Sequence, residues 1–235
     1  MFGGFFLGAM SPSRTGELAR GMWIPGHPFI KTVSLTFIEK GLNQFVVLFF
    51  GFVTLTVILP WHLKLFSLAG VIVLVTGLIL IHRLNHVWRR VLGRFLSAAT
   101  VDNILTALVA LSPERIVTAL ILSVIIYIGY SAHFYCLLLG FSHIPLTIAL
   151  KTLPIIYFVD QLLPLSYGDF GVKEMASVSV LGYYGITGGI ALSASFIQNV
   201  LTLLIPALIG GLIILAARFR RASEAPPSSV RETPL

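Results

Sequence analysis

The chain has 235 residues, of which 57% are hydrophobic and 11% are charged, and its mean hydropathy is +0.95. A soluble domain carries about 25% charged residues, so the composition excludes an ordinary soluble domain and indicates a helix bundle in a bilayer. The net charge of +7 does not indicate nucleic acid, because the basic residues cluster beside apolar segments, as the positive-inside rule expects. The single cysteine, Cys136, excludes a disulfide framework.

The first apolar segment, residues 1–10, is too short to cross a bilayer, which needs about 20 residues. It lacks the basic beginning and the cleavage site of a signal peptide. We therefore interpret it as the end of a helix and expect the domain to be incomplete at its N-terminus. A polar phrase follows from Pro12 to Arg20, and it reads proline, three residues, glycine and an acid.

Two apolar helices joined by a tight turn are predicted next. Residues 31–59 form a long helix that carries its charges early and is apolar from Phe45 onwards. Residues 60–62 form the turn at the membrane interface, where Trp61 suits the headgroup layer. Residues 63–84 have the length and composition of a transmembrane helix.

The middle of the chain alternates between surface and spanning segments. Residues 85–111 mix basic and apolar side chains at helical spacing, which predicts an amphipathic helix or helix pair on the inner membrane surface. Ser112 and Pro113 are a typical helix start, and they open a span that runs to Leu139. The last span covers about residues 187–217 and ends at a basic cluster. We expect residues 1–221 to form one membrane domain, and residues 222–235 to be a disordered cytoplasmic tail rich in proline and serine.

Two shorter apolar pieces, residues 146–163 and 172–184, lie between these spans. The flanking basic residues leave two topologies open. In one, both pieces enter from the outside and meet within the membrane as a re-entrant pair. In the other, they are two short crossings whose loop lies at the inner surface. We favour the re-entrant pair, because non-helical backbone at membrane depth is tolerated where it lines a cavity.

The loop between these pieces, Pro164–Glu174, repeats the order of Pro12–Arg20. Each phrase is followed by a helix and later by two adjacent amides inside an apolar span. These amides are Asn43-Gln44 in the first half and Gln198-Asn199 in the second. Interrupted segments at corresponding positions of two halves are typical of a transporter binding site.

The second loop has the chemistry of an anion site. Its glycines permit close approach of a ligand, and a helix that begins beside it directs its free amide groups towards the loop. Lys173, with Arg14 and Arg20 from the first phrase, would add positive charge suited to a phosphate. Asp169 and Glu174 would pair with these cations or relay a proton. In the alternative interpretation, Lys173 and Glu174 form ion pairs that cap the helix.

These residues also carry a resemblance to a known family. The stretch 164–185 resembles the hallmark of the lysylphosphatidylglycerol synthase transmembrane-domain family, whose typical phrase is Pro-Ile-Ser, a glycine-rich turn and Gly-Val-Arg-Glu. Lys173 stands where that family usually has arginine, and Asp169 stands where glycine is common. The segments Pro12–Arg20 and Glu39-Lys40 resemble two further signatures, although the family's first helices are absent.

The resemblance implies a multi-pass, flippase-like protein of the inner membrane that acts on lipids with polar headgroups. We expect an all-α, polytopic transmembrane helix bundle with two polar, re-entrant loop–helix segments. It would bind an anionic or polyprenyl-phosphate-linked lipid and move it between leaflets. Bifunctional members add a soluble domain that transfers lysine from its tRNA onto phosphatidylglycerol, but only a short tail follows Arg221, so this transfer is not implied. The candidate substrate-binding residues are Arg14, Glu17, Arg20, Glu39, Lys40, Ser166, Asp169, Lys173 and Glu174.

Other kinds of site find little support. His82 and His86 have the spacing of metal ligands but flank Arg83, so we interpret them as interfacial and expect no metal. A phosphate-binding loop motif and a serine-hydrolase elbow are both absent, and we expect no cofactor, catalytic residue or nucleic-acid partner. Two alternatives to a flippase stay open. One is a membrane-embedded transferase with Asp169 or Glu174 as base, and the other is an accessory subunit of a lipid-synthesis enzyme. A homo-oligomer is compatible with the flippase and with both alternatives.

Overall fold

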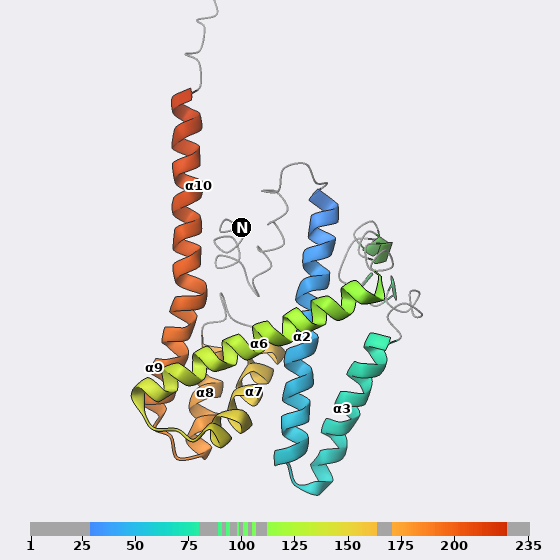
Figure 1. Cartoon of the computed structure of the whole chain (residues 1–235), viewed down its shortest axis with the longest axis vertical. Helices are drawn as coiled ribbons and strands as arrows, with labels where there is room; N and C mark the ends of the chain where they lie inside the picture. The colour runs from blue at the N-terminus through green and yellow to red at the C-terminus, as the bar shows by residue number, and fades with distance from the viewer. Residues whose placement is uncertain are drawn as a thin grey trace, which may run out of the picture.

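The computed structural model describes residues 29–79, 89–90, 93–94, 98, 101–102, 105–106, 112–163 and 171–224. These residues form helices joined by short turns, with no strand among them, which confirms the predicted all-α class. The helices are α2 (Phe29–Ile58), α3 (Trp61–Ile79), α6 (Pro113–Phe141), α7 (Leu146–Leu162), α8 (Val172–Tyr183), α9 (Gly188–Asn199), the π-helical segment η2 (Val200–Leu204) and α10 (Ile205–Glu224) (Figure 1).

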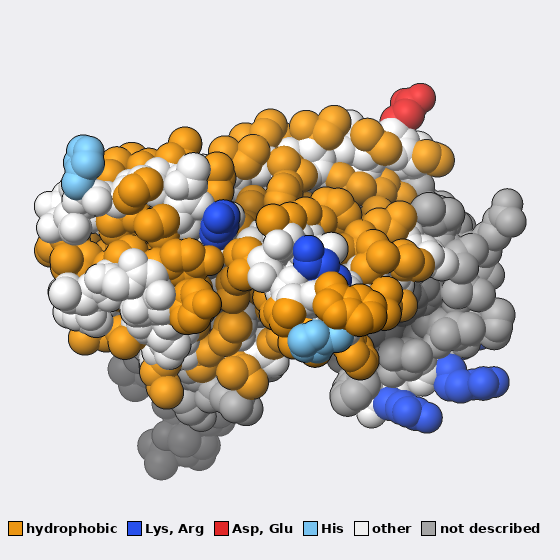
Figure 2. Space-filling view, turned by 90° about the horizontal axis from the view of Figure 1, so that it is seen from below, with side chains coloured by type: hydrophobic (Ala, Val, Ile, Leu, Met, Phe, Trp, Pro, Cys, Tyr) orange, Lys and Arg blue, Asp and Glu red, His pale blue; other side chains and the backbone are white. Residues whose placement is uncertain are grey.

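Four stretches of the described chain are long and apolar enough to cross a membrane. They are Thr32–Ile58, Trp61–Leu78, Pro113–Phe141 and Gly188–Ala216, the last of which runs through α9, η2 and α10. Hydrophobic side chains cover most of the surface seen from below (Figure 2). A soluble monomer does not expose apolar surface on this scale, so this surface is suited to lipid.

The helix α2 packs against α3 and α7 through two glycines. A Cβ added to Gly70 would lie 2.5 Å from the ring of Phe52, and one added to Gly51 would lie 2.4 Å from the ring of Phe158. Small residues at these crossings let the helices approach closely, as is usual in membranes. The turn before α3 is shorter than predicted, because α3 already begins at Trp61.

The helix α6 begins as predicted. Ser112 has extended backbone angles (φ −64°, ψ 149°), and Pro113 occupies the first helical position, where its missing N–H costs no hydrogen bond. The predicted amphipathic segment, residues 85–111, lies mostly outside the described residues. Within it, Arg89 and Asp102 form an exposed ion pair of 2.7 Å.

The two short apolar pieces become α7 and α8. At 1.5 Å per residue, the 17 residues of α7 span about 26 Å and the 12 residues of α8 about 18 Å, both less than the roughly 30 Å hydrocarbon core. Both helices lie in the lower part of the molecule, beside α2 and α9 (Figure 1). Their depth in a bilayer, and with it the re-entrant topology, stays a prediction.

The last span is not a uniform α-helix. It changes to π-helical geometry over Val200–Leu204 and then continues as α10 to Glu224, which lies within the predicted tail. Residues 225–235 lie outside the described part of the chain. The α9 half packs firmly against α6 and α8, because Ala191, Ala194 and Ser195 are fully buried and allow close contact.

Candidate functional site

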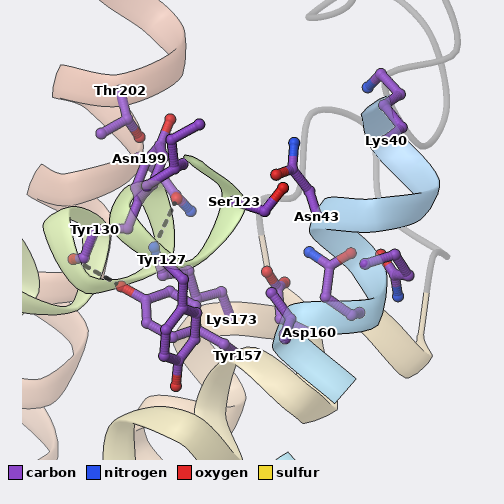
Figure 3. A pocket seen from close by; sticks show the side chains of 14 residues that line it. Lys40, Asn43, Ser123, Tyr127, Tyr130, Tyr157, Asp160, Lys173, Asn199 and Thr202 are labelled. Atoms are coloured by element: carbon purple, nitrogen blue, oxygen red, sulfur yellow. Dashed lines mark hydrogen bonds between the residues drawn. The ribbon is translucent and has the colours of Figure 1, made fainter. Parts of the chain in front are cut away.

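A cavity of about 330 Å³ lies between α6 and five other helical elements, namely α2, α7, α8, α9 and η2 (Figure 3). Its walls are unusually polar for the interior of an apolar bundle. They include two ammonium groups, one carboxylate, four amides, two hydroxyls and three tyrosines. The lining residues are Lys40, Asn43, Gln44, Val47, Ser123, Ile126, Tyr127, Tyr130, Tyr157, Asp160, Gln161, Lys173, Asn199 and Thr202.

The cavity lies about halfway along the long helices. The lining residues fall at 40–47 on α2, at 123–130 on α6 and at 199–202 on α9 and η2, each near the middle of a candidate span. The short helices contribute differently, since α7 provides residues near its C-terminus and α8 provides Lys173 in its first turn. In a bilayer crossed by these candidate spans, polar side chains at this position would be expensive and usually functional.

Lys173 is the most constrained charge in the site. Only 5% of its surface is exposed, although it lines the cavity wall. Its Nζ donates to Gln198 Oε1 at 2.5 Å and to Asn199 Oδ1 at 3.3 Å. The same atom lies 5.3 Å from the ring centroids of Phe134 and Tyr157. The amide oxygens and ring faces offset part of the cost of burying the ammonium group.

Gln198 is fully buried and orients the groups around the Lys173 ammonium. Its Nε2 donates to Tyr130 O and to Tyr157 Oη, both at 3.0 Å. The Tyr157 hydroxyl donates in turn to Tyr130 O at 3.0 Å. With both amide hydrogens and the phenol hydrogen used in this way, Gln198 Oε1 faces Lys173 as an acceptor. The network therefore joins α6, α7, α8 and α9 at one point.

Glu174 stabilises the neighbouring amide. Its Oε2 accepts a hydrogen bond from Gly171 N at 2.7 Å, and its Oε1 accepts one from Asn199 Nδ2 at 2.8 Å. The first bond caps α8. It depends on Gly171, whose φ of +100° is strained for any other residue. Through the second bond Glu174 fixes the orientation of Asn199, so that the Asn199 oxygen faces Lys173.

An aromatic cluster supports the cavity from α2, α6 and α7. The rings of Phe50 and Tyr127 are stacked at 4.7 Å, and those of Tyr127 and Tyr157 meet edge to face at 6.1 Å. Phe134 meets Tyr157 at 6.2 Å. Stacked and edge-to-face pairs of this kind contribute about 0.5–1.5 kcal/mol each beyond the burial of their area. They fix the ring faces that lie beside the Lys173 ammonium.

Four of the nine predicted site residues lie in the described part of the chain. Lys40 and Lys173 both line the cavity, from α2 and α8 respectively. Glu174 contacts Asn199 and is not among the cavity's lining residues, and the Glu39 side chain is exposed on α2. The other five candidates lie outside the described residues. These are Arg14, Glu17, Arg20, Ser166 and Asp169.

The cavity also contains residues that the predicted set omitted. Both amide pairs, Asn43-Gln44 and Gln198-Asn199, take part in the site, as lining residues or through Lys173. Amides in an apolar span were a usable signal for them. The tyrosines gave no such signal, since aromatic residues are common in spans and only the packing shows which ones face a cavity.

Comparison with known proteins identifies one family. The family model described as "Lysylphosphatidylglycerol synthase TM region" matches residues 1–210. No curated protein and no solved structure matched the chain. The chain belongs to the lysylphosphatidylglycerol synthase TM region family, and with its four candidate spans this indicates a multi-pass membrane protein of lipid-related envelope processes.

Proposed function

We propose that this protein binds the anionic headgroup of a membrane lipid in the cavity and moves that headgroup between leaflets. The observation that carries the proposal is the position of Lys173, a buried ammonium at the wall of a polar cavity, midway along the candidate spans. Placing a charge in this position costs free energy, so a charge found there usually has a role in ligand binding or in the fold. Lys40, on the α2 side of the same cavity, adds a second positive charge for an anion.

The neutral groups of the cavity suit a headgroup that crosses the bilayer. The amides of Asn43, Gln44 and Gln161 can each donate and accept hydrogen bonds, so they can replace water around a phosphate or a hydroxyl. A path of this kind lowers the cost of moving a polar headgroup through the apolar layer. The lipid tails need no such path, because the outer surfaces of the helices are apolar.

The test is a scrambling assay in reconstituted vesicles. Fluorescent phosphatidylglycerol is placed in both leaflets, and an impermeant reductant bleaches the outer one. Vesicles that contain the protein should lose the inner-leaflet signal as well, whereas empty vesicles should keep it. Equal protection of the inner leaflet in both would refute the proposal.

Matched variants connect the assay to the site. Lys173→Met removes the ammonium group that would bind the phosphate, and a lost charge-assisted hydrogen bond of about 1.5–3 kcal/mol predicts scrambling slower by roughly tenfold to a hundredfold. Lys64→Met is the control, since it makes the same chemical change on the exposed surface of α3. It should scramble at the native rate. Equal rates for the two variants would contradict the role of Lys173.

A further inference from the structure

The π-helical segment Val200–Leu204 interrupts the last span beside the cavity. Ile205 N donates to Val200 O, five residues back, in place of the usual four. Pro206 accounts for this wider turn, because it has no N–H to give to Thr202 O and its ring would clash with that carbonyl in an α-helix. Single π turns in α-helices are frequent at functional sites and at sharp kinks.

The two sides of this segment are packed very differently. On the α9 side, Gln198 and Asn199 are buried and bonded to neighbouring helices. On the α10 side, Leu208 is 58% exposed and Leu212 is 66% exposed, while Ala207 and Gly210 on the other face are buried. Within the described chain, α10 contacts η2 and no other helix, and it extends beyond the other described helices (Figure 1). Beyond the covered face at Ala207 and Gly210, a change in the angle of α10 would alter its contact with η2 and with no other helix that the structure describes.

The same segment is connected to the cavity by two residues. Asn199, the last residue of α9, lines the cavity and is bonded to Lys173 and Glu174. Thr202, within the π turn, also lines the cavity, and its hydroxyl donates to Gln198 O at 2.7 Å. A threonine that bonds to the preceding turn in this way tends to bend a helix. The π turn therefore lies next to the amides that hold the Lys173 ammonium.

We propose that η2 is a hinge that changes the angle of α10 when an anion occupies the cavity. An anion beside Lys173 competes with Gln198 Oε1 and Asn199 Oδ1 for the ammonium hydrogens. Once these amides are released, the anchor on the α9 side of the π turn is weakened, and Thr202 and the turn are free to rearrange. This inference rests on the proposed headgroup site, and it adds the movement that would accompany occupancy.

Spin labels on the full chain can measure this movement. One label uses the native Cys136, which is exposed on α6, and the second uses Leu215→Cys on α10, at a side chain that is 51% exposed. Residue 215 lies about 16 Å beyond η2, so a change of about 20° at the hinge shifts it by about 5–6 Å. The control pair joins Cys136 to Leu192→Cys on α9, which is 49% exposed and lies before the hinge.

The distances are compared in nanodiscs of phosphatidylcholine with and without phosphatidylglycerol. We expect the 136–215 distance to shift with the anionic lipid and the 136–192 distance to stay constant. Pro206→Ala restores the missing donor and should reduce the shift. An unchanged 136–215 distance, an equal shift in the control pair, or a full shift in Pro206→Ala would overturn the hinge.

The two proposals fail in different ways. If the protein scrambles phosphatidylglycerol but the 136–215 distance stays constant, the hinge is wrong and the proposed function stands. If the distance shifts with phosphatidylglycerol but no scrambling occurs, the hinge stands and translocation is wrong.

Discussion

The bond between Gln198 and Lys173 is the interaction whose removal gives the clearest energetic prediction. Gln198→Leu keeps the approximate volume of the side chain but removes every polar atom of the amide. It breaks the bonds to Tyr130 O and Tyr157 Oη, and it leaves the buried Lys173 ammonium with one fewer acceptor. Lys173→Met removes the charge and leaves the amide in place.

The free energy of unfolding lost in Gln198→Leu has two parts, one from the neutral hydrogen bonds of the amide and one from its bond to the charged Lys173 ammonium. Hydrogen bonds between helices in membranes average about 0.6 kcal/mol, so the two neutral bonds of Gln198 contribute about 1.2 kcal/mol. A hydrogen bond to a charged group contributes about 1.5–3 kcal/mol. Gln198→Leu should therefore destabilise the native chain by about 3–4 kcal/mol, but the Lys173→Met variant by only about 1 kcal/mol. The expected coupling between the two positions is about 1.5–3 kcal/mol.

The assay is a double-mutant cycle of unfolding in mixed micelles. Native, single and double variants are titrated with a denaturing detergent, and loss of helix is followed by circular dichroism. Lys64→Met replaces Lys173→Met in a control cycle, because α3 has no contact with α9 in the described chain. In this control cycle, the effects of the two substitutions on the free energy of unfolding should add within about 0.5 kcal/mol. If the effects of Gln198→Leu and Lys173→Met on the free energy of unfolding also add, the argument that this bond holds the site together is refuted.

Two further predictions concern stability away from the cavity. Gly51→Ala should destabilise the chain by about 1–3 kcal/mol, because its Cβ would overlap the inner atoms of the buried Phe158 ring, whereas Gly41→Ala meets open space and should be neutral or slightly stabilising. Thermal unfolding in detergent compares the two, and equal midpoints would contradict the packing at this crossing. Asp102→Asn breaks the exposed ion pair with Arg89 and should change stability by less than about 1 kcal/mol in the same assay.

The helices could be predicted from the sequence because each depends on local signals. Pro60 ends α2 near its predicted boundary, since the residue before a proline is disfavoured in a helix. Ser112 and Pro113 begin α6 as predicted. The π turn was not predicted. Pro206 was visible inside an apolar run, but a proline in such a run can kink, widen or end a helix, and the neighbouring packing decides which of these occurs.

The cavity could be predicted only in part, because it depends on which helices meet. The charges near residue 173 were recognised from the cost of placing them in lipid. Asn43 and Asn199 were noticed as amides in apolar spans, but their shared cavity follows from the packing of α2 and α9 around α6 and α7. Sequence spacing contains no information on that packing. Gln198 was missed as an orienting group for the same reason, since its three partners lie on three other helices.

Part of the polar character of the cavity follows from the short length of α7 and α8, which contribute Asp160, Gln161 and Lys173. A full span places its polar ends at the two membrane surfaces, about 30 Å apart. The C-terminal end of α7 and the first turn of α8 instead lie beside the middle of α2, of α6 and of the last candidate span, Gly188–Ala216. Asp160 and Lys173 are therefore ordinary helix-end residues that the fold places at the midpoint of its longest helices.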